Sequence, residues 1–328
     1  MNDPVCVVII GRNEGERLKD CLRSVIGITE GIVYVDSGSS DGSVEYACSK
    51  NVAVVELDMS LPFSAARARN EGFFHLICKY PEFQFVQFID GDCQLCGDWL
   101  APAKKYLQEN PGCAIVAGRR AERYPEKSVY NLLCDIEWDT PIGEAKACGG
   151  DFMIRRESFE KAGGFNPEVV AGEEPELCYR LRRQGWTIYR LGQLMTIHDA
   201  DITRFNQWWM RAVRSGHAYA QGLMLHGFEG KGYCVRASLR IWFWAFLFPG
   251  LISGGIALYS YKIIFLSSLY FVHFIKIAIS LNKRQRGIKR TLIYALFNIV
   301  GNFPLLFGQA AYLFRRFRRK NVVIVEYK

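Results

Sequence analysis

The C-terminal third of this sequence has almost no acidic residues. Residues 231–328 hold sixteen Lys and Arg against the single acid Glu326, a balance of +15, whereas residues 1–230 hold 25 basic and 32 acidic residues, a balance of −7. The same C-terminal part contains long uncharged apolar runs, which a soluble nucleic-acid-binding protein would not usually combine with its basic region. An anionic membrane surface explains both features. We therefore expect membrane lipids, and no nucleic acid, as partners of this region.

Two phosphate-binding signatures are missing as well. The first expected strand, Val5–Ile10, is followed by G-R-N-E-G, which matches neither the G-x-G-x-x-G pattern of dinucleotide-binding domains nor the G-K-[ST] of a P-loop. This absence argues against a Rossmann dehydrogenase and against a nucleotidyltransferase with a Lys-bearing phosphate loop. No signal peptide precedes the first strand, so we expect it to lie in the cytoplasm.

The eleven cysteines form no repeating frame. Their number is odd, many stand in apolar contexts, and Cys93 and Cys96 are the only C-x-x-C pair. A zinc site of the usual kind needs a second pair. The cysteines are therefore expected to be free thiols in a reducing compartment.

Short apolar runs alternate with amphipathic stretches through the first half of the chain. Expected strands are 5–10, 31–35, 52–57, 83–89 and 113–117, and expected helices are 16–26, 43–50, 64–80 (capped by Ser64) and 98–109. Beyond them the pattern predicts strands at 152–154 and 186–191 and helices at 157–162, 176–184 and after residue 203. This alternation indicates an α/β fold with a mostly parallel, doubly wound, Rossmann-like sheet. We assign it to a catalytic domain over residues 1–230.

Carboxylates follow two of these strands. The apolar run 83–89 ends in Asp90, Gly91 and Asp92, and the second strand ends at Asp36 in an anionic loop. Two carboxylates this close repel each other unless a cation or hydrogen-bond donors hold them. Mg²⁺ and Mn²⁺ bind such oxygen pairs and share them with phosphate. The pattern therefore favours a nucleotide whose base and ribose meet carboxylates and whose diphosphate meets a metal; a plain Asp-Gly turn is the alternative.

The basic tail contains three apolar stretches. Ile241–Tyr261 and Ile263–Asn282 are long enough to span a bilayer, so a hairpin of two spans is predicted near 241–282. The third stretch, Thr291–Phe314, has a polar middle with Pro304, and basic clusters flank it on both sides. The positive-inside rule puts both clusters in the cytoplasm, which makes the segment near 291–320 re-entrant or interfacial. Residues 231–328 thus form a predicted membrane-associated region, and buried helices of a soluble domain are the alternative.

An ordered set of motifs resembles a known family. V-V-I-I-G-R-N-E, V-D-S-G-S-S-D-G-S, A-R-A-R-N-E-G, D-G-D, G-G-F-N and G-E-E-P-E-L follow one another as in the family 2 glycosyltransferases of GT-A fold, over roughly residues 4–225. W-W-M-R-A-V-R-S-G and the closing I-V-E-Y-K resemble a membrane-associated bacterial branch linked to exopolysaccharide assembly.

The resemblance implies a metal-dependent, inverting transfer of a sugar from a nucleotide sugar, with a UDP-sugar as the expected donor. The implied acceptor is a hydroxyl of a lipid-linked saccharide at the cytoplasmic face of the inner membrane. A polyprenyl phosphate or another lipid as acceptor remains an alternative, as does a non-catalytic assembly component that keeps the fold.

The resemblance also implies roles for single residues. Glu14 and Asp36 would bind the nucleoside with Arg69 and Asn70 beside it, and Gly150 and Asp151 would line the donor sugar. Asp90 would reach the ribose and the Mn²⁺ or Mg²⁺, which Asp92 and His198 would also bind. Glu174 stands where the family has a catalytic Asp, so Glu174 is the expected base and Glu173 the other candidate. Trp208, Trp209, Arg211 and Arg214 would lie near the acceptor and the diphosphate, although the Trp pair could equally belong to the core.

Overall fold

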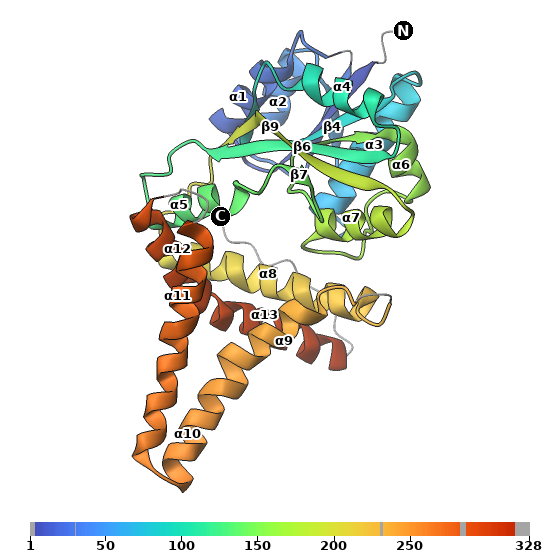
Figure 1. Cartoon of the computed structure of the whole chain (residues 1–328). Helices are drawn as coiled ribbons and strands as arrows, with labels where there is room; N and C mark the ends of the chain where they lie inside the picture. Colours follow the sequence, from blue (N-terminus) through green and yellow to red (C-terminus); the bar gives the residue numbers. More distant parts are fainter. Residues whose placement is uncertain (1–3, 30, 230–231, 283–286, 319–328) are drawn as a thin grey trace. The chain divides into compact units, whose positions relative to one another are not determined.

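The chain divides into two compact units. The computed structural model describes residues 4–29, 31–229, 232–282 and 287–318 (Figure 1). The first unit comprises Met1–Tyr124 and Glu137–Asp201, and the second comprises Pro125–Ile136 and Ile202–Lys328. The first unit thus ends before the boundary predicted at residue 230, and the assignment of 202–230 to the catalytic domain stays a prediction.

One mixed β-sheet forms the centre of the first unit. Its parallel part runs β3 (Ala53–Glu56), β2 (Gly31–Asp36), β1 (Val5–Gly11) and β4 (Phe85–Asp90). It continues through β8 (Phe152–Arg155), β6 (Cys113–Glu122), β9 (Thr187–His198) and β5 (Cys93–Leu95), with β7 (Gly143–Glu144) paired to β9. The predicted α/β fold class is confirmed, and the sheet departs from simple alternation where β8 lies antiparallel between β4 and β6.

Amphipathic helices cover this sheet because their apolar residues recur at helical spacing. Helix α1 (Glu16–Val25) buries Leu18, Cys21, Leu22 and Val25. Helix α3 (Ala65–Lys79) begins after Ser64, whose hydroxyl accepts the Arg67 N–H at 3.1 Å, so the predicted N-cap is confirmed. The other helices of this unit are α2 (Ser43–Ser49), α4 (Leu100–Glu109), α6 (Arg156–Lys161) and α7 (Glu173–Arg183).

Strand register brings the acidic strand ends together. Asp36 of β2 pairs with Gly11 of β1, and Asp90 of β4 pairs with Ile10 of β1, so three neighbouring parallel strands end at one level. Ligands of open α/β sheets bind at this carboxyl edge. The fold therefore places the two predicted acidic turns at the expected edge.

Two strands extend beyond their predicted ends. Strand β6 was expected to stop at residue 117 and β9 at residue 191, whereas they reach Glu122 and His198. Their parallel pairing shifts register between Ala117 and Arg120, and beyond these bulges both strands continue past the predicted ends. The extension of β6 is mostly polar and that of β9 begins with Gly192 and Gln193, so the apolar pattern breaks at both predicted ends.

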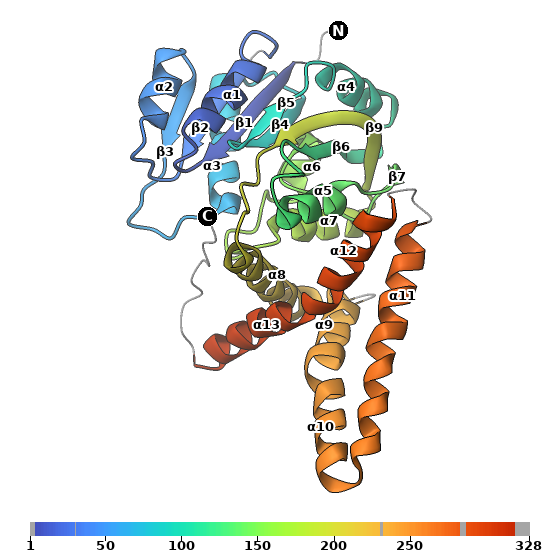
Figure 2. The same ribbon diagram turned by 90° about the vertical axis from the view of Figure 1, so that its left-hand side faces the viewer.

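The second unit is helical (Figure 2). It holds most of α5 (Val129–Trp138), then α8 (Phe205–His226), α9 (Val235–Trp242), a π-helical turn at Phe243–Leu247, α10 (Phe248–Leu258), a 3₁₀ segment at Tyr261–Ser267, α11 (Ser268–Asn282), α12 (Ile288–Val300) and α13 (Asn302–Phe317). Helices α10 and α11 form a long hairpin in both views. Helices α8 and α13 pack closely, since a Cβ added at Gly308 would lie 2.0 Å from the Val213 carbonyl oxygen.

Three helical segments of the described chain are long and apolar enough to cross a membrane. They are Val235–Leu258, Tyr261–Leu281 and Ile288–Phe317. The first two match the predicted hairpin in position. The third changes from α12 to α13 at Gly301, and its re-entrant or interfacial placement stays a prediction. Residues 283–286 of the first basic cluster and the closing I-V-E-Y-K lie outside the described residues.

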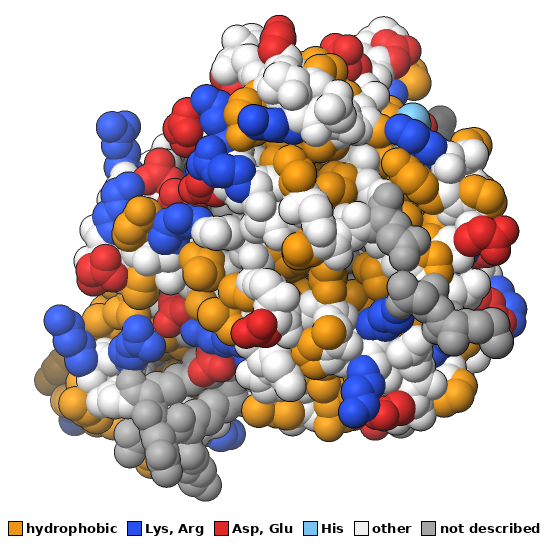
Figure 3. Space-filling model, turned by 90° about the horizontal axis from the view of Figure 1, so that it is seen from above, with side chains coloured by type: hydrophobic (Ala, Val, Ile, Leu, Met, Phe, Trp, Pro, Cys, Tyr) orange, Lys and Arg blue, Asp and Glu red, His pale blue; other side chains and the backbone are white. Residues whose placement is uncertain are grey.

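Charges of both signs are interspersed with apolar side chains on the face shown in Figure 3. The net negative charge of residues 1–230 therefore forms no continuous acidic field on that face.

Candidate active site

Asp36 builds the turn at the end of β2. Its carboxylate is buried and accepts the Tyr34 hydroxyl at 2.7 Å and the backbone N–H groups of Gly38 and Ser39 at 2.9 and 2.7 Å. Glu14, in the loop after β1, pairs with Arg17 at 2.7 Å. Both acids stand at the carboxyl edge, and Asp36 is rigidly held there.

The loops after β1 and β2 are tied to each other. The Asn13 N–H donates to the Ser39 hydroxyl at 2.9 Å, and the Gly15 N–H donates to the Asp41 carboxylate at 2.8 Å. These bonds fix the two loops against each other at the sheet edge.

Arg69 bridges three acids from distant parts of the chain. Its guanidinium lies 2.8 Å from Asp90, 3.0 Å from Glu173 and 3.1 Å from Glu174, and its side chain is 2% exposed. We call these four residues the Arg69 cluster. The cluster joins the end of β4 to the first turn of α7, where the helix dipole also favours acids. Arg69 is thus a buried bridge between two predicted functional groups, and its role beside the nucleotide stays a prediction.

Glu174 has the ionisation expected of a general base. Burial, together with the neighbouring Glu173 carboxylate, raises the pKa of Glu174 to about 7, although Arg69 opposes the shift. A base with a pKa near the working pH combines the reactive form with a useful affinity for a proton. Asp90 differs, because Arg69 and Arg120 outweigh its burial and lower its pKa.

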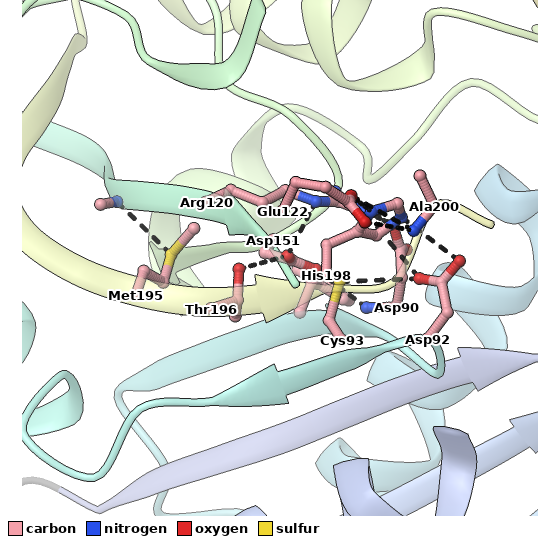
Figure 4. A network of polar contacts seen from close by, with 12 residues as sticks. Asp90, Asp92, Cys93, Arg120, Glu122, Asp151, Met195, Thr196, His198 and Ala200 are labelled. Atoms are coloured by element: carbon pink, nitrogen blue, oxygen red, sulfur yellow. Dashed lines mark hydrogen bonds and ion pairs between the residues drawn. The ribbon is translucent and has the colours of Figure 1, made fainter. Parts of the chain in front are cut away.

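Arg120 lies among three other carboxylates (Figure 4). Its guanidinium is 3.3 Å from Asp90, 3.9 Å from Asp92 and 3.5 Å from Asp151, and it stacks 4.6 Å above the ring of Trp138. Arg120 and its three aspartates are the Arg120 cluster, which shares Asp90 with the Arg69 cluster. In the described part of the chain, Nε of Arg69 is buried without a hydrogen-bond partner, and Nε of Arg120 is buried 3.5 Å from Oδ2 of Asp151. Such donors suit the oxygens of an anionic ligand.

Asp92 and His198 suit a divalent cation. Nε2 of His198 lies 3.3 Å from Oδ2 of Asp92, and both side chains are buried. Nδ1 of His198 faces the Glu122 carboxylate at 3.1 Å, which directs Nε2 toward Asp92. Possible ligand atoms of Asp92, Cys93 and His198 lie within 4.8 Å of one another, and those of Asp90, Cys93 and Asp151 form a second such group. Carboxylates and imidazole are ligands that Mn²⁺ accepts, so these residues fit a divalent cation, and the predicted set of Asp90, Asp92 and His198 around one ion stays a prediction.

Gly150 and Asp151 follow the same edge. A Cβ at Gly150 would lie 2.5 Å from Oδ2 of Asp90 and 2.8 Å from Nη2 of Arg69, so only glycine fits there. Asp151 accepts the Asp90 backbone N–H at 2.9 Å and the Thr196 hydroxyl at 2.7 Å. Asp151 is thus fixed within the Arg120 cluster.

Five further predicted residues lie outside the two clusters, and their predicted roles stay predictions. The side-chain amide of Asn70 bonds both the N–H and the carbonyl of Phe165, at 2.9 and 2.8 Å, which holds the Gly164–Phe165 turn. Trp208 is buried in the second unit between Tyr130 and Phe297. The remaining three, Trp209, Arg211 and Arg214, also lie on α8 of that unit. The structure thus brings together the predicted residues of the first unit, and Trp208 is a core residue.

Arg120 and Glu122 were missed from the sequence. Both lie on the polar extension of β6, in R-R-A-E, where they alternate with Arg119 and Ala121. A strand places residues two apart on the same face, so this alternation was the available signal.

Residues 6–163 match the sequence model of glycosyl transferase family 2. This segment, just under half of the chain, is similar to the family 2 glycosyltransferases. No curated protein matches this enzyme in sequence. A mannosyltransferase from Pyrobaculum calidifontis, solved with GDP-Man and Mn²⁺, is similar to it in structure, with 16% identity, a TM-score of 0.65, and coverage of 95% of this chain and 88% of that chain. This likeness shows the GT-A fold.

Two further structures are more distantly similar. Glucosyl-3-phosphoglycerate synthase from Mycobacterium tuberculosis has 18% identity and a TM-score of 0.47, covering 70% of this glycosyltransferase and 82% of that chain. TarS from S. aureus has 14% identity and a TM-score of 0.48, covering 94% and 91%.

Proposed function

We propose that this glycosyltransferase transfers a sugar, with inversion, from a nucleotide sugar to a hydroxyl of a lipid-linked saccharide at the cytoplasmic face of the inner membrane. The observation that carries the proposal is the Arg69 bridge, which connects Glu174, a base with a pKa of about 7, to Asp90 of the candidate metal site. The proposed base and the proposed site of the leaving group are thus connected through the buried side chain of Arg69.

In the proposed step, Glu174 accepts the proton of the acceptor hydroxyl as its oxygen attacks the anomeric carbon. The bond between that carbon and the diphosphate breaks on the opposite face, and the nucleoside diphosphate leaves with the electron pair. One displacement inverts the anomeric centre. Glu173 is the weaker candidate for the base, because its side chain is 6% exposed against 14% for Glu174, whereas Arg69 binds both acids at nearly the same distance.

Positive charge for the leaving diphosphate is proposed to come from Arg120, whose buried guanidinium lies 3.3 Å from Asp90 and 3.9 Å from Asp92. Asp90, Asp92 and His198 would hold a Mn²⁺ or Mg²⁺, which supplies further positive charge at the diphosphate. Arg211 and Arg214 of α8 remain proposed contacts of the acceptor or the diphosphate.

The nucleoside half is proposed to lie over the ends of β1 and β2. Asp36 and Glu14 stand there with acceptor oxygens, which suit ribose hydroxyls and the N–H of a uracil base. A UDP-sugar is the proposed donor, and the GDP-Man bound by the P. calidifontis enzyme makes GDP-mannose the necessary comparison.

A thermal-shift panel of nucleotide sugars with Mn²⁺ tests donor binding on the full-length enzyme in detergent. One donor is expected to raise the melting temperature only when Mn²⁺ is present, because a ligand of the folded state stabilises it. Asp92→Asn is expected to abolish this shift, whereas the exposed-site control Asp98→Asn keeps it. If no nucleotide sugar binds, or if Asp92→Asn binds as well as the wild type, the proposal is wrong.

Glu174→Gln separates catalysis from binding. This variant is expected to keep the donor-induced shift and to lose roughly 10²- to 10⁴-fold in transfer rate. Transfer at the wild-type rate would remove Glu174 from the mechanism and return the role to Glu173.

The acceptor class is tested with membranes and radiolabelled donor. Organic extraction is expected to recover the label, and mild acid is expected to release it as an oligosaccharide. Release as a monosaccharide would identify a polyprenyl phosphate acceptor instead, and label that stays in the aqueous phase would contradict a lipid acceptor.

A further inference from the structure

Glu122 is a buried acid whose carboxylate faces His198. Its side chain has 0% exposure, and Oε2 lies 3.1 Å from Nδ1 of His198. The backbone N–H of Ala200 donates to both carboxylate oxygens at 3.2 Å. A carboxylate oxygen accepts the proton of Nδ1 in this contact, and a neutral His198 with that proton on Nδ1 keeps the lone pair of Nε2 toward Asp92.

We infer that Glu122 is a positioning residue, which fixes the tautomer and the orientation of His198 so that Nε2 binds the divalent cation. This inference rests on the metal site of the proposed function. It assigns Glu122 to the metal site through His198 and not as a ligand of the ion.

The strand register explains why the three groups meet. Glu122 of β6 is the direct partner of His198 on β9, and His198 is in turn the partner of Cys93 on β5, the residue after Asp92. Three neighbouring strands thus place carboxylate, imidazole and carboxylate in one line (Figure 4). Bulges in the pairing of β6 with β9 produce this register.

The imidazole ring is held on a second side as well. The ring of Trp138 packs edge-to-face against His198, with centroids 4.5 Å apart at 81°. With Nδ1 bonded to Glu122 and the ring packed against Trp138, rotation would break both contacts. Carboxylates that hold a ligating histidine in this way typically contribute 10- to 100-fold to metal affinity.

A purely structural role is the competing explanation. Glu122 also binds the Ala200 N–H, and this bond alone stabilises the chain as it leaves β9. A structural role predicts lower stability without a specific loss of metal affinity. Metal affinity and melting temperature must therefore be measured on the same samples.

Calorimetric titration of the metal-free, full-length enzyme with Mn²⁺ tests the inference. Glu122→Gln keeps the side-chain volume and is expected to weaken Mn²⁺ binding by 10- to 100-fold, with a melting temperature close to wild type. The matched control is Gln94→Ala on β5, which removes a 2.9 Å bond with Arg123 in the same strands and is expected to bind Mn²⁺ as the wild type does.

A double-mutant cycle with His198→Ala shows whether Glu122 acts through His198. In the His198→Ala background, Glu122→Gln is expected to cause no further loss of affinity, because the group it positions is gone. Additive losses would overturn the inference, as would an unchanged affinity of Glu122→Gln alone. If the wild type itself binds no Mn²⁺, the metal site of the proposed function fails and the inference falls with it.

The tautomer of His198 gives a readout that needs no folded Glu122 variant. In ¹⁵N-histidine-labelled wild type with saturating Mg²⁺, the expected state has the proton on Nδ1, and His198→Gln identifies the resonance. A proton on Nε2 would overturn the inference.

Discussion

Both arginine clusters hold more negative than positive charge, and they differ in what relieves this excess. Each sets one buried guanidinium against three carboxylates, Arg69 against Asp90, Glu173 and Glu174, and Arg120 against Asp90, Asp92 and Asp151. In the Arg69 cluster burial, together with the Glu173 carboxylate, raises the pKa of Glu174 to about 7, so a proton relieves the excess negative charge. In the Arg120 cluster Asp92 lies beside His198, so a divalent cation is the proposed relief.

This difference matches the chemistry proposed for each cluster. A general base must take up and release a proton near neutral pH, whereas a metal ligand must stay ionised. Asp90 belongs to both clusters, and its lowered pKa places it on the ionised side. Protonation of Glu174 and cation binding beside Asp92 can thus be tested by separate experiments.

Removing Arg120 is expected to have the largest effect on stability. Arg120→Met leaves Asp92 and Asp151 without their buried guanidinium, whereas Asp90 keeps Arg69, and this costs about 3 to 5 kcal/mol in the metal-free enzyme. Added Mn²⁺ is expected to raise the melting temperature of this variant more than that of the wild type, because the ion replaces the lost charge. Differential scanning fluorimetry with and without Mn²⁺ measures both effects.

Arg123→Met is the control for this comparison. Arg123 follows β6 and its side chain is 26% exposed, so its loss is expected to change stability by no more than about 0.5 kcal/mol. Equal melting temperatures of Arg120→Met and wild type would show that the aspartates do not need the guanidinium.

Glu174→Gln is expected to stabilise the enzyme above neutral pH. The pKa of Glu174 is higher in the folded protein than the ordinary value of 4.5, so folding loses stability as the pH rises from about 4.5 to about 7. A neutral amide removes this loss, and a gain of about 1 to 3 kcal/mol is expected at pH 8. No gain is expected near pH 4.5, where the wild-type acid is protonated in the folded state.

Denaturation at the two pH values measures this gain. Glu109→Gln, at an exposed position on α4, is the control and is expected to show no pH-dependent difference. A gain that is equal at both pH values would indicate better packing and not relief of charge.

The sequence predicted the Arg69 cluster far better than the Arg120 cluster. Asp90, Glu173 and Glu174 stand at the ends of regular apolar patterns, where a strand end or a helix start is readable, and a family resemblance supplied their roles. Arg120 and Glu122 lie on a polar continuation of β6 that depends on bulged pairing with β9. No local pattern encodes that pairing, because β6 and β9 are brought together by the whole sheet.

The same reason explains why the sequence did not reveal the contacts of other predicted residues. Arg69 and Asn70 are neighbours in one motif, and the sequence offered no way to see that Arg69 reaches α7 while Asn70 holds the Phe165 turn. The sequence left open whether Trp208 lies near the acceptor or in the core. Its burial against Tyr130 and Phe297 depends on elements far away in the chain. Tertiary contacts thus decided what local spacing left open.

Glu173→Gln is expected to give the smallest effect, and it tests how the Arg69 cluster sets the base. Glu173 is the second cause, after burial, of the raised pKa of Glu174, so removing its charge lowers that pKa. The wild-type kcat/KM is expected to rise with pH through about 7 as Glu174 loses its proton, and in Glu173→Gln this rise moves to lower pH. The rate at the alkaline plateau is expected to stay within about tenfold of wild type, because Glu173 itself does not take the proton.

A pH–rate profile over pH 5–9 measures both the position of the rise and the plateau rate. A rise that disappears in Glu173→Gln would make Glu173 the base, and a rise that stays at the wild-type pH would show that burial alone sets the pKa of Glu174.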